Sequence, residues 1–425
     1  MSGQDFQQTE NALPFWCLMF FTFVLFIAPQ AIFPSLEPLR LAKASAGLAG
    51  ITYILDRLAT GRPLTVITPE VRLVVWLICL AVLSIPLSFW PGGSLDYLLA
   101  DYVKSVIIFF LIVNLVQTER RMRVLIGSII GWGVIISSNA LLDFRMGNWM
   151  AQSQRIVGYS SPLASDPNDL ALTLNLILAL TIGFYLATTR LLTRLMLLAV
   201  MVLLAAGVIA SFSRGGFLAL SAILIISLFG LVRKRGPAIL LPLIALLLLA
   251  FSLLPPGYGE RIYSIYDSSA DETGSADARW TGMVRAFKLM FAHPLLGSGL
   301  NMNGLGSSHI REGVHSAYLQ VGADLGIPAL LIYLTLNWYL FKGVRQAQAH
   351  LRGFPSDRGL LGLGTGIEIA LITYVVGGFL LAVAFHFHFY YIAGFAIAFS
   401  GLAKRRRLPV ADLGNTKSIE PPPHH

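Results

Sequence analysis

Long runs of apolar residues, separated by short polar loops, restrict the fold of this chain more than any other feature. The runs are about 17 to 25 residues long, which is the length that an α-helix needs to cross a bilayer. With 56% apolar and only 12% charged residues among 425, the chain is too hydrophobic for a soluble protein of this size. Backbone groups in lipid must be paired within the chain. The sequence therefore predicts an all-α polytopic integral membrane protein.

About twelve transmembrane helices are expected from the lengths of these runs. Residues 1–254 would hold helices one to nine, 255–314 a large outer loop, 315–403 helices ten to twelve, and 404–425 a tail that is expected to be disordered. The expected spans are 14–33, 39–56, 71–89, 98–116, 123–143, 169–187, 192–212, 215–232, 238–254, 316–341, 363–384 and 386–402.

Lysine and arginine residues predict the orientation, because short loops rich in them stay on the cytoplasmic side. Alternate loops carry most of the basic residues, and no cleavage pattern follows the first span, so both termini are expected in the cytoplasm. The net charge of +9 is then mainly a signal of topology, and no nucleic-acid partner is expected. These loops contain Arg57, Arg62 and Arg72; Arg120, Arg121 and Arg123; Arg190 and Arg194; Arg233 to Arg235; Lys342, Arg345, Arg352 and Arg358; and Lys404 to Arg407.

The long outer loop has a helical pattern of its own. From Trp280 to Phe291, apolar residues recur at helical spacing while Arg279, Arg285 and Lys288 take the other side. An amphipathic helix in the outer membrane interface is expected, ending at His293-Pro294. The glycines that follow, at 297, 299, 304 and 306, predict a mobile approach to the next span.

Three polar residues at the outer mouths of spans are the main candidates for chemistry: Arg214, Arg279 and His315. Each has a structural alternative. An interfacial arginine such as Arg214 often only extends its charge toward lipid headgroups, and Arg279 could bind lipid phosphate. His315 begins a helix, where an exposed polar residue is ordinary. Against the first alternative, the flanking glycines of Arg214 would let the backbone approach a bulky anion closely.

Other polar residues have mainly structural interpretations. Asp166, in Asp166-Pro167-Asn168-Asp169, is typical of a helix N-terminus. His386 and His388 stand among aromatic residues and suggest an interfacial aromatic belt. Glu368 has no role that the sequence indicates.

Three ordered motifs resemble those of the O-antigen ligase and O-antigen polymerase superfamily of bacterial envelopes. They are Ser211-Phe212-Ser213-Arg214-Gly215-Gly216; Arg279-Trp280 followed by Pro294-Leu295-Leu296-Gly297-Ser298-Gly299; and His315-Ser316-Ala317-Tyr318-Leu319-Gln320 with Gly326 after it. The resemblance implies a bacterial inner-membrane enzyme with a periplasmic active site. Such an enzyme moves a glycan from an undecaprenyl diphosphate carrier to an acceptor.

That reaction needs two kinds of group. Guanidinium groups stabilise the negative charge that develops on a departing diphosphate, and Arg214 and Arg279 are the candidates for it. A neutral histidine can take the proton of the acceptor hydroxyl, and His315 is the candidate base. Direct displacement with inversion is expected, with no covalent enzyme intermediate. The possible auxiliary cations on the outer side are Arg145, Arg155, Arg285 and Arg311.

No cofactor is expected, since the outward loops hold no motif of metal ligands and the chain has no phosphate-binding loop for ATP. A sugar hydroxyl of the lipid A-core is the favoured acceptor, which would make the chain an O-antigen ligase. An O-antigen polymerase or a protein O-oligosaccharyltransferase of the same superfamily is the alternative. A lipid or solute transporter fits less well, because no paired internal repeat is visible.

Overall fold

The computed structural model describes residues 12–150, 155–156, 159–235, 275–304, 314–354 and 357–406. Within these ranges the chain is helical, and the one β-type pairing is an isolated antiparallel bridge between Trp149 and Ile156. Seven of the described helical runs are long and apolar enough to cross a membrane. The protein is an all-α, multi-pass membrane protein, as the sequence predicts.

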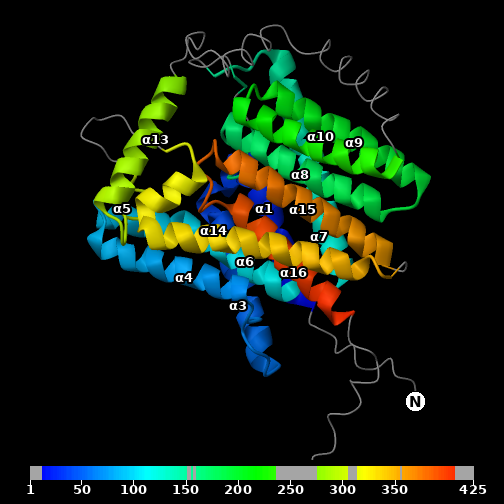
Figure 1. Cartoon of the computed structure of the whole chain (residues 1–425), viewed down its shortest axis with the longest axis horizontal. Helices are drawn as coiled ribbons and strands as arrows, with labels where there is room; N and C mark the ends of the chain where they lie inside the picture. Colours follow the sequence, from blue (N-terminus) through cyan, green and yellow to red (C-terminus); the bar gives the residue numbers. More distant parts are fainter. Residues whose placement is uncertain are drawn as a thin grey trace, which may run out of the picture.

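Most of the helices run side by side, and α13 lies steeply inclined to α14 at one end of them (Figure 1). In chain order the helices are α1 (Ala12–Ile27), α2 (Pro29–Ile32), α3 (Leu41–Ala59), α4 (Pro69–Ser84), α5 (Pro91–Tyr97), α6 (Val103–Leu115), α7 (Glu119–Met146), α8 (Pro167–Ala187), α9 (Leu191–Ala210), α10 (Arg214–Arg235), α13 (Ser275–Ala292), α14 (Ala317–Leu351), α15 (Arg358–Gly378) and α16 (Phe387–Arg405). A π-helical turn, Leu98–Tyr102, joins α5 to α6.

Each expected span outside residues 236–274 corresponds to a described helix. The expected span at 238–254, residues 255–274 of the outer loop and the tail from residue 407 lie outside the described residues. The predicted end of the first span at residue 33 was wrong. Helix α1 ends at Ile27, because Ala28 takes a left-handed conformation (φ 45°) directly before Pro29.

Helix α8 lies deep in the bundle: 72% of its most apolar stretch is buried, whereas only 22% of the corresponding stretch of α9 is buried. Its glycine Gly183 faces α15 so closely that a Cβ atom there would lie 2.7 Å from the Cα of Gly366. Small residues at such crossings let helix backbones approach. This packing fixes α8, whose first turn forms part of the site described below.

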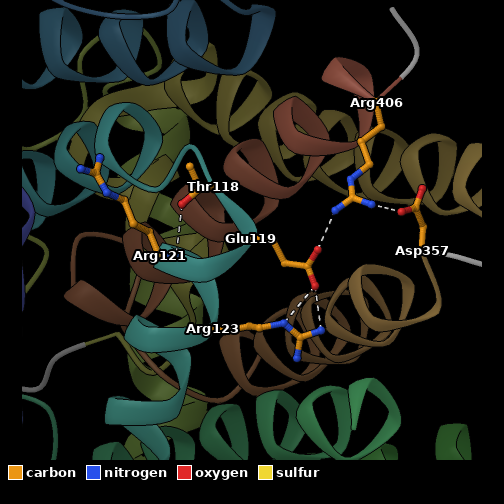
Figure 2. A network of polar contacts seen from close by, with 6 residues as sticks. All are labelled: Thr118, Glu119, Arg121, Arg123, Asp357 and Arg406. Carbon is orange, nitrogen blue, oxygen red and sulfur yellow. Dashed lines mark hydrogen bonds and ion pairs between the residues drawn. The ribbon is translucent and has the colours of Figure 1, made fainter. Parts of the chain in front are cut away.

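One end of the bundle gathers the basic loops, and we call it the basic end. Glu119 opens α7 there, and its carboxylate accepts hydrogen bonds from Arg123 at 2.7 and 2.9 Å and from Arg406 at 2.8 Å (Figure 2). Arg406 also pairs with Asp357, just before α15. The starts of α7 and α15 and the end of α16 therefore meet at this end. This gathering agrees with the alternation of basic loops along the sequence.

Helix α14 is broken near its first third, at Gly326, whose φ of 85° and ψ of 176° are not helical. The carbonyl of Ala323 would normally pair with the N–H of Ile327, but that N–H donates to Pro294 O at 2.8 Å. The carbonyl of Asp324 has no usual partner either, since residue 328 is proline. Two N–H groups from outside the helix replace the missing ones: Ser298 donates to Ala323 O at 2.8 Å and Gly299 to Asp324 O at 3.0 Å.

The break makes Gly326 sensitive to substitution. A Cβ there would lie 2.6 Å from the carbonyl carbon and oxygen of Leu295, in a backbone conformation that L-residues rarely adopt. We expect Gly326→Ala to lower the stability of the folded protein by about 2 kcal/mol or more. Thermal unfolding in detergent would measure the loss. Gly131→Ala is the matched control, because a Cβ at Gly131 meets nothing within 4 Å; equal melting temperatures for both variants would contradict the prediction.

The expected amphipathic helix is α13, which starts five residues before Trp280 and ends at Ala292. Its apolar residues divide between two sides. Ala286 and Met290 are buried, and Ala286 packs with Val314 and Ala323, whereas Trp280 and Phe287 are 70% and 53% exposed. The helix therefore rests on the outer part of α14 and presents a second apolar side outward, as an interfacial helix does.

Candidate active site

His315 lies directly before the first turn of α14, at the end of the bundle opposite the basic end. Ser316 is the N-cap residue of the helix, and His315 is half-buried. Burial lowers the pKa of the His315 imidazole below its ordinary value of 6.5, and the positive charge of Arg279 lowers it further. The negative charge of Asp166 raises this pKa, and the positive charge of Arg155 lowers it. These charges come from three other segments, so the fold brings those segments close to His315.

Asn168, in the first turn of α8, joins two of the segments. Its Oδ1 accepts a hydrogen bond from Arg155 Nη2 at 2.7 Å and one from Ser213 Oγ at 2.8 Å. Both hydrogen bonds lie in a largely buried setting, where paired polar groups rigidify a site. Arg155 is thereby held beside the motif that contains Arg214. Sequence reasoning treated Asn168 only as part of a helix start, and no spacing rule identified its two partners.

Asp166 caps α8, since its side chain accepts from the N–H of Asn168 at 2.7 Å. The helix-start interpretation of this motif is therefore confirmed. Because Asp166 also acts on the pKa of His315, the same cap supplies a negative charge to the site. No pattern in the sequence indicates this second role.

Arg214 is the first residue of α10, after a tight turn that follows α9. Phe212 has a φ of 52° in this turn, and Ser213 Oγ accepts from the N–H of Gly216 at 3.1 Å. Gly216 also has a packing role: a Cβ there would lie 2.4 Å from the Cβ of Ala171, so this glycine lets α10 pack on α8. An anion close to the backbone of these glycines is still a prediction.

Arg279 and Arg285 both lie on α13 and are half-buried. Arg279 acts on His315 through its charge, as described above. Arg145 lies in the last turn of α7 and is exposed. Arg311 lies outside the described residues. Among the auxiliary candidates, Arg155 is tied to the site by its hydrogen bond to Asn168.

The described part of the glycine-rich segment after α13 is packed at Gly297 and Gly299, contrary to the mobility expected from the sequence, whereas Gly306 lies outside the described residues. A Cβ at Gly297 would lie 2.3 Å from the backbone of Asp324, and one at Gly299 would lie 2.1 Å from Ser88 Oγ. Asn303 adds two hydrogen bonds to the buried carboxylate of Asp324, both at 2.9 Å, and accepts one from the N–H of Val314 at 3.2 Å. Gly297 permits close contact with the broken helix. Asn303 holds Val314, the residue directly before His315, so this segment helps to position His315.

The aromatic-belt interpretation of His388 was wrong. This side chain is only 2% exposed, and its Nε2 lies 2.7 Å from Thr173 Oγ1 on α8. Thr173 donates its own proton to the carbonyl of Leu163, so His388 Nε2 must be the donor of the pair. His388 thereby ties α16 to the segment that leads into α8. A periodicity argument could not find this contact, because its partner is more than 200 residues away.

Among the residues that the structure describes, no group of three or more His, Cys, Asp or Glu side chains is arranged to hold a metal ion. The described polar groups around His315 include arginines, the carboxylate of Asp166 and hydrogen-bonded amides and hydroxyls. Such a group can bind an anion through guanidinium groups and accept a proton at an imidazole.

The comparisons with known proteins agree with the resemblance. Residues 199–334 match the family model described as O-Antigen ligase. The matched range starts within α9 and ends within α14, and it includes Arg214, Arg279 and His315 but not Arg155 or Asn168. A search of curated proteins found no match.

Proposed function

The chain is a member of the O-antigen ligase and O-antigen polymerase superfamily, and from this premise we propose that it is an O-antigen ligase. The family supports membrane-bound glycan transfer in general. In the proposed reaction, an O-antigen glycan moves from undecaprenyl diphosphate to a sugar hydroxyl of the lipid A-core. The reaction would take place at the periplasmic face of the bacterial inner membrane, with the basic end of the bundle in the cytoplasm.

One observation carries the proposal: His315 lies half-buried directly before α14, close enough to Arg279, Asp166 and Arg155 for their charges to act on it. The grouping supplies a base that stays neutral near pH 7 beside cations that suit a diphosphate. Asn168 extends the group to Ser213, the residue before Arg214. Residues from four separate parts of the chain thus contribute to one end of the bundle.

The proposed mechanism assigns one task to each group. The oxygen of the acceptor hydroxyl attacks the anomeric carbon while His315 takes its proton. The bond between the anomeric carbon and the phosphate oxygen breaks, and undecaprenyl diphosphate leaves with the electron pair. Arg214 and Arg279 bind the phosphate oxygens through paired N–H donors as this charge develops. A single displacement of this kind inverts the anomeric configuration.

Comparing acceptors with the purified protein tests the proposal. Full-length protein in nanodiscs would receive carrier-linked O-antigen together with lipid A-core, a second carrier-linked glycan or a pilin-like protein. Transfer to lipid A-core alone is the expected result. Transfer to the second glycan would identify a polymerase, and transfer to the protein would identify a protein O-oligosaccharyltransferase. Movement of the carrier-linked glycan across the bilayer without any transfer would favour the transporter.

Metal independence is a prediction of the same mechanism. Because two arginines stabilise the leaving diphosphate, no divalent cation is needed for that task. We expect the transfer rate to stay unchanged when EDTA is present in excess over all divalent cations. Loss of activity with EDTA, followed by recovery on addition of Mg²⁺ or Mn²⁺, would show that carboxylate ligands had been overlooked.

The pH dependence of transfer provides a separate check on His315. Only the neutral imidazole can accept the proton, so the rate should fall as the pH drops through the pKa of this residue. Because that pKa lies below 6.5 in the folded protein, the acid limb of kcat/KM is expected below about pH 6.5. An acid limb centred above pH 6.5 would contradict the lowered pKa.

A further inference from the structure

A cavity lies at the same end of the bundle as His315, beside the last turn of α7. Its volume is about 590 Å³, which falls within the range of roughly 300 to 1,000 Å³ typical of small-ligand sites. It opens between the end of α7 and the end of α2. The described residues that line it are Ala31, Ile32, Asn139, Asp143, Gly147, Asn148, Trp149, Tyr159 and Ser160.

The lining favours a neutral, polyhydroxylated ligand. Asp143, Asn139 and Asn148 offer carboxylate and amide groups, which can accept from and donate to hydroxyls. Trp149 is 40% exposed and provides an apolar surface with an indole N–H, suited to the C–H face of a sugar ring. No lysine or arginine is among the described lining residues, and Asp143 would repel an anion. A sugar therefore fits this cavity better than a phosphate group.

Local contacts hold the lining in place before any ligand binds. Asn148 donates from Nδ2 to Asp143 Oδ1 at 3.0 Å and from its backbone N–H to Asp143 O at 2.9 Å. Gly147, with a φ of 72°, makes the turn that brings these residues together. Tyr159 is fixed by a hydrogen bond from its hydroxyl to Ile27 O at 2.8 Å. Such preorganisation reduces the entropy lost on binding.

The cavity is also coupled to the candidate active site. The ring of Trp149 meets Phe212 edge to face at 5.9 Å, and Phe212 stands two residues before Arg214. The N–H of Met150 donates to Arg155 O at 2.7 Å. Arg155 in turn donates to Asn168, as described above. Met150, next to the wall residue Trp149, therefore pairs with the arginine that donates to Asn168 at the site.

We infer that this cavity binds a neutral sugar residue of a substrate, either of the carrier-linked glycan or of the acceptor. The inference rests on the proposed function, because both substrates of that reaction carry sugars. The cavity would hold the glycan beyond the reacting sugar and so contribute to the choice of substrate.

Binding can be tested without catalysis. Saturation-transfer NMR on the full-length protein in nanodiscs would use two probes: the free glycan released from the carrier by mild acid, and core oligosaccharide freed of lipid A. One of them is expected to give a signal in the wild-type protein and in His315→Ala. The signal should disappear in Asp143→Ala and in Ser160→Trp, which fills the cavity from an exposed position. Asp96→Ala, an exposed carboxylate on α5 outside the cavity, is the matched control.

Kinetic measurements provide a second test of the inferred sugar site. For Asp143→Ala we expect KM for the sugar-bearing substrate to rise about tenfold, with kcat within about twofold of wild type. A rise confined to the donor KM identifies the carrier-linked glycan as the ligand, and a rise confined to the acceptor KM identifies the core sugar. If wild-type protein binds neither probe, or if the cavity variants bind as well as Asp96→Ala, the inference is wrong. Absence of transfer with intact probe binding would instead reject only the proposed function.

Discussion

Replacing His315 with alanine is expected to reduce the rate of glycan transfer by about 10² to 10⁴, the usual effect of losing a general base. The side chain is half-buried at the mouth of α14, beside Arg279, Asp166 and Arg155. Without it, the acceptor hydroxyl must lose its proton to water while it attacks. Binding of the carrier-linked donor should stay near normal, since in the proposed mechanism the histidine acts on the acceptor. Single-turnover rates with purified protein and donor binding at equilibrium would measure the two quantities.

His350→Ala is the matched control for this experiment. His350 lies in the last turn of the same helix, at the basic end, where its ring packs against Phe354 at 5.3 Å. Its removal should leave the transfer rate unchanged. A purified His315→Ala protein that turns over at nearly the wild-type rate would refute the assignment of the base.

Replacing Arg214 or Arg279 with lysine is expected to reduce the rate about tenfold to a hundredfold, although the charge is kept. The guanidinium group binds two phosphate oxygens at once, and an ammonium group cannot reproduce this geometry. The lost charge-assisted hydrogen bond accounts for roughly 1.5 to 3 kcal/mol. The loss should appear mainly in kcat, because the charge on the diphosphate grows in the transition state.

Arg190→Lys serves as the control for these two variants. Arg190 is exposed at the start of α9, in a loop of the basic end, and no contact with the candidate site is expected for it. Wild-type rates for both Arg214→Lys and Arg279→Lys would show that these residues anchor lipid headgroups, as the alternative interpretation of interfacial arginines holds.

Much of the architecture could be predicted because its causes are local in the sequence. Apolar runs of bilayer length identify the helices, and Asp166-Pro167 marks the start of α8 through the chemistry of its own side chain. The apolar spacing after Arg279 identifies α13 in the same way. In each case, the residues that decide the structure lie within a few turns of one another.

The failures share a different cause. Gly297 and Gly299 suggested mobility, but each is used to approach a distant backbone or side chain. His388 was placed in a belt because its sequence neighbours are aromatic, whereas its partner Thr173 lies on α8. A glycine or histidine in the sequence shows which contacts are possible. Only the packing of distant segments determines which of them form.

The same distinction, between local sequence patterns and contacts of distant segments, applies to the residues of the candidate site. Motif order was enough to nominate Arg214, Arg279 and His315, although their roles are still predictions. Asn168 was missed because an asparagine after Asp-Pro satisfies the local rule for a helix start and leaves nothing to explain. Its contacts with Arg155 and Ser213 depend on the meeting of a loop with the turn before α10.

The break in α14 has a mechanical consequence. The hydrogen bonds that replace the missing helical ones fasten the 294–299 segment to residues 323–327, and α13 packs on the same part of α14. The segment fastened in this way directly follows the helix that carries Arg279, and the part of α14 that it is fastened to begins just after His315. The break in α14 therefore sets the position of Arg279 relative to His315: the carbonyl groups that a continuous helix would have used within itself hold the next segment of the site in place.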